Sequence, residues 1–264
     1  MTESPTPDPD VSGIHVAEAG DGPLILCLHG IGSSSASFVA QRTAWAASYR
    51  VAAWDAPGYG RSTDPDRRLD LRSYARIAAA LIAARGGRAH VIGMSWGGVI
   101  AMQLAVDHPD LIDRLVLGDS TRGSATSPDR ARAMRARSVE LAELGPRPFA
   151  EIRAGRLLRP AATESERRRV ASDMAAAIRW PGYDSAAACM ADTDMTRVLP
   201  RIVAPTLVAY GRHDVVTGRP EADALAAGLP HARVAVIDDA GHLANQENPA
   251  RFNQVVGQFL SNGR

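Results

Sequence analysis

Short apolar runs alternate with longer amphipathic stretches along most of this chain. The apolar runs cover residues 13–19, 24–29, 51–55, 90–94, 115–118, 206–210 and 233–237. Several of them are apolar at successive positions, as strands must be when helices cover both faces of a parallel sheet. The pattern therefore predicts an α/β fold, in which helices join the strands of a doubly wound, mostly parallel sheet.

Helices are expected between these strands, and capping residues mark their ends. Ser73 is a good N-cap for a helix that ends at Gly86 and Gly87, because its hydroxyl can accept from free backbone N–H groups. Asn248 followed by Pro249 predicts the start of a last helix, since proline has no N–H to leave unpaired in the first turn. Two further helices are expected over residues 96–107 and 221–228.

Residues 121–197 interrupt the alternation of strands and helices. Their pattern is helical without a convincing strand, so we expect a helical cap (121–197) inserted into an α/β core made of residues 13–120 and 198–264. Ligands of open α/β sheets bind beyond the carboxyl ends of the strands, where such an insertion would cover them. Residues 1–12 are rich in proline and acidic residues, and we expect a flexible tail there.

The composition of the 264 residues is that of an ordinary globular protein, with 45% hydrophobic and 22% charged residues. No apolar run approaches the roughly 20 residues that span a bilayer, and the N-terminus lacks the pattern of a signal peptide. Cys27 and Cys189 are too few and too far apart for a disulfide framework or a structural zinc site. We expect a cytoplasmic protein without a membrane partner or a bound metal.

The charge is unevenly distributed, although the net charge is only +1. All 30 basic residues are arginine, which excludes chemistry that needs a lysine amine, such as Schiff bases. Twelve arginines and six acidic residues fall between Arg122 and Arg169. Phe149 is the one aromatic residue among them, so we expect no nucleic-acid partner. Two interpretations stay open: a solvated helical surface, or a positive rim that attracts an anionic small molecule.

A candidate nucleophile lies where a predicted strand meets a predicted helix. The sequence Gly93-Met94-Ser95-Trp96-Gly97 joins the strand of 90–94 to the helix of 96–107. A serine at the apex of such a turn has a strained backbone and an exposed hydroxyl, and only small residues fit two positions to either side. Ser95 is therefore the predicted nucleophile.

A serine nucleophile needs a base, and the base needs an acid that orients it. Two further strands end near suitable side chains: Asp214 follows the strand of 206–210, and His242 follows the strand of 233–237. The carboxyl ends of parallel strands share one edge, so we predict that His242 is the base and Asp214 the acid. Asp119, after the strand of 115–118, is the alternative acid, and His213 is the rival base.

Acyl chemistry also needs backbone N–H groups to hold a developing oxyanion. His29-Gly30-Ile31-Gly32 follows the strand of 24–29, and we expect its Ile31 N–H to be one donor and the Trp96 N–H the other. We interpret His29 as a residue that positions this loop rather than as a proton carrier. The segment of residues 55–62, rich in glycine and proline, is interpreted as a structural turn.

Taken together, these motifs resemble the α/β-hydrolase fold superfamily. The resemblance rests on His29-Gly30-Ile31-Gly32, on residues 55–62, on residues 93–98, on Gly211-x-x-Asp214 and on Gly241-His242, and it covers nearly the whole chain. It implies that Ser95 is the nucleophile, His242 the base and Asp214 the orienting acid. The serine at position 95 distinguishes the chain from the haloalkane dehalogenase and epoxide hydrolase branches, which carry aspartate at the matching position.

Within the superfamily, the chain looks most like the branch of 3-oxoadipate enol-lactonases and small carboxylesterases. The matching segments are residues 180–183, 189–194 and 240–249. This resemblance implies hydrolysis of a small carboxylic ester or lactone without a cofactor, and the basic cap adds the expectation of an anionic substrate. Trp96 stands where the branch usually has methionine, and we expect Trp96 and Trp180 to contact the substrate. The sequence leaves the oligomeric state open.

Other activities stay open at this point. The same triad could hydrolyse a carbon–carbon bond of a ring-cleavage dienoate, act as a cofactor-free perhydrolase, or persist in a non-catalytic small-molecule receptor. A dinucleotide-binding oxidoreductase would also explain Gly30-Ile31-Gly32 followed by Asp55, but Ser35 stands where that motif has its third glycine.

Overall fold

A single seven-stranded sheet forms the centre of the computed structural model, which describes residues 11–261. Its order is β1-β3-β2-β4-β5-β6-β7; β1 is antiparallel to β3, and the other neighbouring pairs are parallel. The strands are β1 (Val16–Ala19), β2 (Leu24–Leu28), β3 (Arg50–Trp54), β4 (Ala89–Met94), β5 (Ile112–Gly118), β6 (Thr206–Gly211) and β7 (Ala232–Ile237). The predicted fold class is confirmed. Of the predicted tail, residues 1–10 lie outside the described residues.

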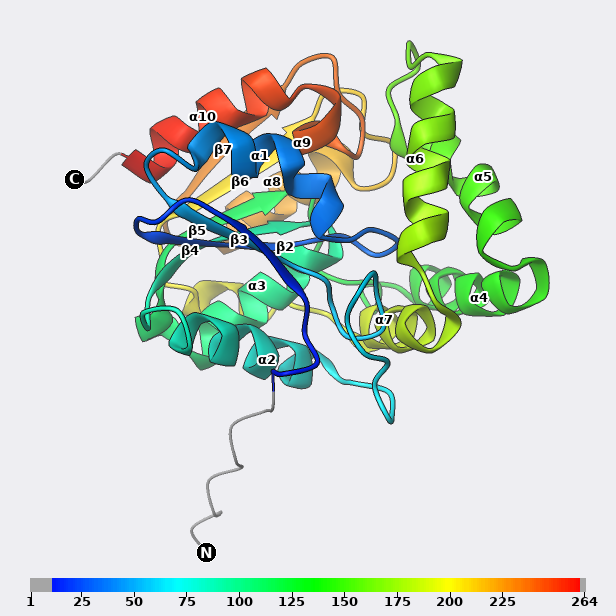
Figure 1. Cartoon of the computed structure of the whole chain (residues 1–264), viewed down its shortest axis with the longest axis horizontal. Coiled ribbons are helices and arrows are strands. Elements are labelled where there is room, and N and C mark those ends of the chain that lie inside the picture. Colours follow the sequence, from blue (N-terminus) through cyan, green and yellow to red (C-terminus); the bar gives the residue numbers. More distant parts are fainter. Residues whose placement is uncertain (1–10, 262–264) are drawn as a thin grey trace, which may run out of the picture.

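Helices cover both faces of the sheet, as the apolar runs require (Figure 1). The core helices are α1 (Val39–Trp45), α2 (Leu71–Ala83), α3 (Trp96–Asp107), α8 (Gly218–Gly228), α9 (Ala244–Glu247) and α10 (Pro249–Ser261). Alternate residues of β2 show the two layers: Leu26 and Leu28 pack with α2 and α3, whereas Ile25 and Cys27 pack with α1 and α10. Every residue of β2 is therefore buried.

Two predicted helix starts are wrong, and the structure gives the reason. The helix predicted to begin at Ser73 begins at Leu71, because the Asp70 carboxylate accepts the Ser73 N–H at 2.8 Å and caps the helix itself. The helix predicted from residue 221 begins at Gly218. The predicted cap of the last helix is confirmed, since Asn248 Oδ1 accepts the Arg251 N–H at 3.2 Å.

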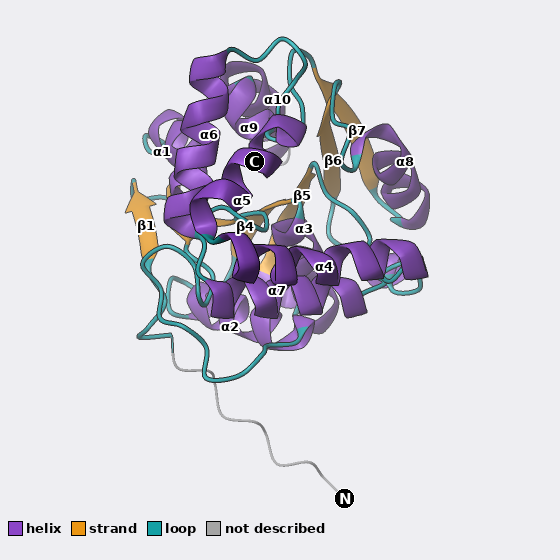
Figure 2. Cartoon of the chain, turned by 90° about the vertical axis from the view of Figure 1, so that its right-hand side faces the viewer, coloured by secondary structure: helices purple, strands orange, loops and turns teal. Residues whose placement is uncertain are grey.

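Four α-helices lie between β5 and β6 within the segment named the cap. They are α4 (Pro128–Leu144), α5 (Pro146–Leu157), α6 (Glu164–Ala177) and α7 (Trp180–Asp192). They pack in two pairs, α4 with α7 and α5 with α6. Figure 2 views the molecule from this side, with the four helices in front of the strands.

The cap meets the core along the loop that follows β3. Gly58 and Gly182 approach so closely that a Cβ on Gly58 would lie 2.3 Å from the Gly182 Cα, and the φ of Gly58 is +81°. Beside them, Arg179 donates to the carbonyl oxygens of Gly60 at 2.6 Å and Ser62 at 2.5 Å. These backbone contacts hold the start of α7 against the core.

The described residues bear on three questions that the sequence raises, namely disulfides, membrane spans and metal ligands. Cys27 and Cys189 are both buried free thiols. Within residues 11–261, no helix combines the length and the apolar character needed to cross a bilayer. The same residues contain no group of three or more His, Cys, Asp or Glu side chains arranged to hold a metal ion.

Candidate active site

Ser95 lies at a strained turn between β4 and α3. Its φ of +50° and ψ of −114° are backbone angles that residues other than glycine rarely adopt. The Ser95 N–H donates to the Gly118 carbonyl at 2.8 Å. The glycines on either side are required by close packing. A Cβ on Gly93 would lie 2.3 Å from the Gly97 oxygen, and one on Gly97 would lie 2.0 Å from the Leu28 oxygen. The predicted need for small residues at both positions is therefore met.

Three strand ends bring Ser95, His242 and Asp214 into one hydrogen-bonded chain. His242 Nε2 lies 3.0 Å from Ser95 Oγ, and His242 Nδ1 lies 3.0 Å from Asp214 Oδ2. Because an ionised carboxylate can only accept, Nδ1 is the donor to Asp214, which leaves the lone pair of neutral Nε2 facing Ser95. This is the geometry that a nucleophile, a base and an orienting acid require.

Burial and hydrogen bonding act in opposite directions on this pair. Burial favours neutral His242, but the hydrogen bond and charge of Asp214, together with the charge of Asp119, outweigh it, so the pKa of His242 is raised above its usual value. For Asp214, burial alone would raise the pKa, yet the hydrogen bonds from His242 and Thr217 hold it well below the usual range. The acid is thus ionised at neutral pH.

The Asp214 carboxylate is held by its own loop. Oδ1 accepts the Val216 N–H at 2.7 Å, and Oδ2 accepts the Thr217 hydroxyl at 2.7 Å and the Gly218 N–H at 2.9 Å. With His242 as a further donor, the carboxylate oxygens are fixed in one orientation. The local fold therefore presents Oδ2 to the histidine.

Among the described residues, the rival acid and the rival base make no hydrogen bond to Ser95 or His242, although the charge of Asp119 helps to raise the pKa of His242. Asp119 is fully buried, with Oδ1 accepting from Gly211 N at 2.8 Å and Oδ2 from Ala244 N at 2.9 Å. Burial raises its pKa to about 7. Its carboxylate ties together the loops that carry Asp214 and His242. The side chain of His213 is exposed.

A cavity of about 260 Å³ opens above Ser95, between the strand ends and the cap. Gly30 and Ile31 line it on the core side, and a Cβ on Gly30 would lie 3.2 Å from the Ser95 Cβ. Trp96 is the first residue of α3, so its N–H has no acceptor within the helix. Of the two residues expected to supply oxyanion donors, Ile31 thus lines the same cavity as Ser95, and Trp96 directly follows Ser95 in the chain. The cap contributes an apolar wall that the sequence analysis missed: Met134, Met174, Tyr183 and Met190.

The expectation that the Trp96 and Trp180 side chains contact substrate is wrong. The Trp96 indole is fully buried and packs edge-on against Tyr74, with the ring centres 4.9 Å apart, and it is not part of the cavity wall. Its large apolar surface is buried in the layer of α2 and α3 rather than beside the nucleophile. Trp180 begins α7 with 47% of its surface exposed, outside the cavity.

His29 holds the loop beside Ser95, as predicted. Its Nδ1 donates to the Gly30 oxygen at 2.9 Å, and its Nε2 accepts from the Ala56 N–H at 3.0 Å. Burial lowers its pKa to about 4, so the ring is neutral and both nitrogens are occupied. Asp55 supports the same region by accepting from the N–H groups of Ser35 at 2.7 Å and Arg61 at 2.9 Å.

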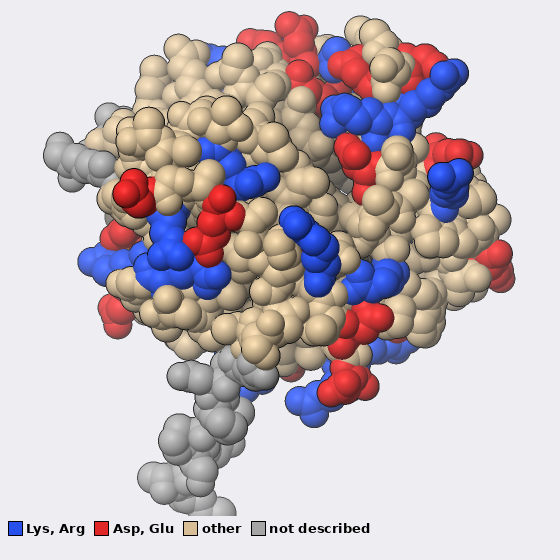
Figure 3. Space-filling model, viewed as in Figure 1, with Lys and Arg blue, Asp and Glu red and all other residues tan. Residues whose placement is uncertain are grey.

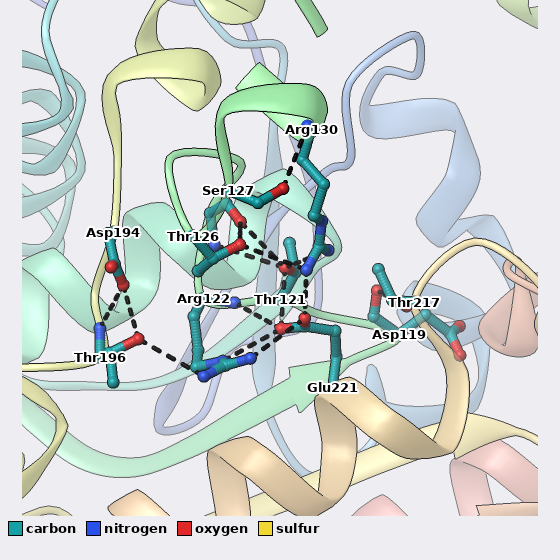
Figure 4. A network of polar contacts seen from close by, with 11 residues as sticks. Asp119, Thr121, Arg122, Thr126, Ser127, Arg130, Asp194, Thr196, Thr217 and Glu221 are labelled. Atoms are coloured by element: carbon teal, nitrogen blue, oxygen red, sulfur yellow. Dashed lines mark hydrogen bonds and ion pairs between the residues drawn. The ribbon is translucent and has the colours of Figure 1, made fainter. Parts of the chain in front are cut away.

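A buried carboxylate fastens the beginning of the cap to the core (Figure 4). Glu221 on α8 forms ion pairs with Arg122 at 3.3 Å and Arg130 at 2.5 Å, and it accepts the Thr121 hydroxyl at 3.0 Å. Burial alone would raise its pKa, but these arginines lower it to about 2. Arg130 also lines the cavity. No pattern in the sequence indicates this network, because Glu221 lies about a hundred residues from its partners.

The fold and this constellation define an α/β hydrolase, and the chain belongs to the alpha/beta hydrolase family, whose model matches residues 25–255. It is 28% identical over 254 residues to "Putative carbamate hydrolase RutD" of Pseudomonas savastanoi pv. phaseolicola, covering 94% of this chain and 97% of that protein. It is 29% identical over 266 residues to a 2-hydroxy-6-oxononadienedioate/2-hydroxy-6-oxononatrienedioate hydrolase of Pseudomonas sp, covering 94% of this chain and 92% of that protein.

A solved structure of an esterase is similar in both sequence and fold. The thermophilic esterase of Thermogutta terrifontis, solved with malate bound, matches with a TM-score of 0.86 and 28% identity over 94% of this chain and 92% of that one. The chain is thus a hydrolase. The interpretation of Gly30-Ile31-Gly32 as a dinucleotide-binding loop is dropped, because in this hydrolase fold the loop lies beside Ser95.

Proposed function

We propose that the chain is a serine hydrolase that cleaves a small carboxylic ester or lactone through an acyl-enzyme on Ser95. The observation that carries the proposal is the chain of two 3.0 Å hydrogen bonds from Ser95 through His242 to Asp214, beside a small cavity. A neutral histidine in this position can take the serine proton as the hydroxyl attacks.

In the first half of the reaction, Ser95 Oγ attacks the carbonyl carbon while its proton moves to His242 Nε2. The N–H groups of Ile31 and Trp96 stabilise the oxyanion that forms. The bond from the carbonyl carbon to the leaving oxygen then breaks, and His242 gives its proton to that oxygen. Asp214 stays ionised throughout and stabilises the imidazolium.

In the second half, a water molecule attacks the acyl-enzyme and His242 takes one of its protons. The bond to Ser95 Oγ breaks, the proton returns from His242 to that oxygen, and the carboxylic acid leaves. One water is consumed and the site returns to its starting state.

The substrate class rests on likeness of sequence and on the charge of the cap. The resemblance to enol-lactonases and carboxylesterases, and the likeness to the esterase of T. terrifontis, favour an ester or lactone. Malate is a dicarboxylate, and it is bound in that esterase. We propose an anionic small-molecule substrate for this chain. We also propose a cytoplasmic location, because both cysteines are free thiols, as is typical of proteins in a reducing compartment.

A second candidate is hydrolysis of a carbon–carbon bond, favoured by the likeness to the 2-hydroxy-6-oxononadienedioate hydrolase. The same three side chains could serve it. A panel of aryl esters, enol lactones, carbamates and ring-cleavage dienoates separates the candidates. We expect an ester or lactone to have the highest kcat/KM; a dienoate that exceeds every ester by tenfold or more would favour the second candidate.

Partitioning of the product in aqueous methanol tests the acyl-enzyme itself. Phenyl and 4-nitrophenyl esters of one acid pass through the same acylated Ser95, so the ratio of methyl ester to free acid should not depend on the leaving group. A ratio that changes with the leaving group would contradict a common acyl-enzyme.

A further inference from the structure

The wall of the cavity above Ser95 carries an unusual amount of positive charge. Elsewhere on the cap, most arginines pair with an acidic residue, as Arg168 does with Glu164 at 2.9 Å. Basic and acidic side chains are accordingly interspersed on the face shown in Figure 3. The cavity differs, because four arginine side chains of the cap line it: Arg130, Arg137, Arg153 and Arg156.

Two of these four arginines have a carboxylate partner. Arg130 pairs with Glu221 at 2.5 Å, and Arg153 lies 3.7 Å from Glu140. The charge of Arg137 meets that of two other arginines, Arg153 and Arg156, and it also acts on His242. No carboxylate within residues 11–261 forms an ion pair with Arg137 or Arg156.

One acidic residue also lines the cavity, but it does not neutralise this charge. Asp173 of α6 pairs with Arg169 at 3.4 Å, and 58% of its side chain is exposed. It therefore lies in a well-solvated position and already has a cation as partner. The positive charge of the inner wall remains.

Arg137 is the most enclosed of the unpaired arginines. It lies on α4, is largely buried, and its guanidinium interacts with the side chain of Tyr183, which is 1% exposed. Burial lowers its pKa, and the charge of Arg153 lowers it further, yet a guanidinium stays protonated at neutral pH. Removing a charge from water without a counter-charge is unfavourable, so this position is prepared for an anion.

We propose that Arg137, together with the Tyr183 hydroxyl, binds a carboxylate of the substrate. The inference rests on the proposed function, since it names the group that the ester or lactone carries away from its scissile bond. Ser95 is on the core side of the cavity and Arg137 on the cap side, so one molecule can meet both. A planar guanidinium binds a carboxylate through two parallel N–H···O bonds, which fixes the substrate in orientation.

The rest of the cap wall limits what lies between the two ends of the substrate. Met134, Met174 and Met190 present thioethers and methylenes to the cavity, whose volume is about 260 Å³. These side chains favour a short apolar body. The substrate class is therefore a small monoester or lactone with a hydrocarbon body and one free carboxylate.

A pair of substrates that differ in this one group tests the proposal. We compare 4-nitrophenyl hydrogen adipate with its counterpart in which a carboxamide replaces the free carboxylate. In wild type, kcat/KM should be higher for the carboxylate ester than for the carboxamide ester, mainly because its KM is lower. Arg137→Gln should reduce that preference at least tenfold, because the carboxylate ester loses more than the carboxamide ester, whereas Arg137→Lys should keep part of the preference.

Arg135→Gln is the matched control. Arg135 lies two residues away on the same helix, is exposed, and pairs with Asp192 outside the cavity. This variant should keep the wild-type preference for the carboxylate. If Arg137→Gln lowers kcat/KM equally for both esters, or if Arg135→Gln removes the preference as well, the carboxylate site is wrong.

Binding without turnover separates this proposal from the proposed function. In a Ser95→Ala background, calorimetry should show that methyl hydrogen adipate binds more tightly than its carboxamide counterpart. Arg137→Gln should remove this difference in affinity. Equal affinity for the two esters in Ser95→Ala would overturn the carboxylate site, whatever the mechanism. If Ser95→Ala instead still hydrolyses them while Arg137 still selects the carboxylate, the proposed function fails and the site stands.

Discussion

At the scale of single residues, His242 is where opposing effects meet. Its burial disfavours the imidazolium, whereas the Asp214 carboxylate at 3.0 Å and the charge of Asp119 favour it, and together they raise the pKa of His242. The same carboxylate is held by the Thr217 hydroxyl and by backbone N–H groups. A rigid acid thus fixes both the tautomer of the base and the direction of its lone pair.

The raised pKa of His242 gives a prediction for the pH profile. The base must be neutral to accept the proton of Ser95, so kcat/KM should rise with pH through an apparent pKa above the ordinary histidine value of about 6.5. Asp214→Asn removes the negative charge and should shift the midpoint of the rise to lower pH, while it lowers the plateau. Initial rates on an aryl ester between pH 5 and pH 9 measure both. A profile that is flat over this range would contradict the role of His242.

At the scale of elements, the sequence predicts the sheet well and the cap poorly. Strands such as β2 and β4 are buried on both faces, so their apolar runs are unmistakable. Ser95, Asp214 and His242 could be found because each follows a strand, and strand ends share an edge. The direction of the Trp96 side chain could not be predicted from the sequence, because it depends on packing against Tyr74 of another helix. The Arg137 environment likewise depends on how α4 meets α5 and α7.

The turn at Ser95 makes a prediction about the packing of β4 and α3. Gly97→Ala should lower the melting temperature and the activity together, because the added Cβ would overlap the Leu28 carbonyl, and a backbone atom cannot give way as a side chain can. Gly155→Ala is the control: it lies inside α5, its added Cβ would come no closer than 3.5 Å to Arg167, and alanine favours helix by about 1 kcal/mol. A Gly97→Ala variant as stable and active as wild type would contradict the close packing.

The network around Glu221 gives a second prediction at this scale. Glu221→Gln should destabilise the protein by about 2–3 kcal/mol, since it leaves Arg122 and Arg130 without their counter-charge. Asp223→Asn is the control on the same helix; its exposed pair with Arg219 should contribute under about 1 kcal/mol. Urea unfolding measures both, and equal effects would mean that the network does not anchor the cap.

The pH dependence of this difference follows from the pKa of Glu221, which is lowered from 4.5 to about 2. A lowered pKa contributes stability that is fully present above the unfolded value and is lost as pH falls towards the folded one. The destabilisation by Glu221→Gln should therefore be largest at neutral pH and shrink between about pH 4.5 and pH 2. A difference that stays constant across this window would contradict the ion pairs.

At the scale of the whole molecule, the unpaired arginines of the cavity should act on a charged substrate before it binds. The Debye length falls from about 30 Å at 0.01 M salt to about 10 Å at 0.1 M, so attraction by exposed charge such as Arg156 weakens over this range. KM for 4-nitrophenyl hydrogen adipate should rise across it, and KM for the carboxamide ester should stay nearly flat. Equal salt responses would leave the arginines of the cap as solvated surface.

The proposed mechanism depends most on Ser95, where the turn, the base and the cavity meet. Its direct test is kcat/KM of Ser95→Ala on an aryl ester, with Ser73→Ala on α2 as a control outside the cavity. Ser95→Ala should melt as wild type does or slightly higher, and should lose about 10³-fold or more in kcat/KM, because binding and oxyanion stabilisation do not replace a nucleophile. Turnover by Ser95→Ala within tenfold of wild type would contradict the nucleophile, and with it the proposed mechanism.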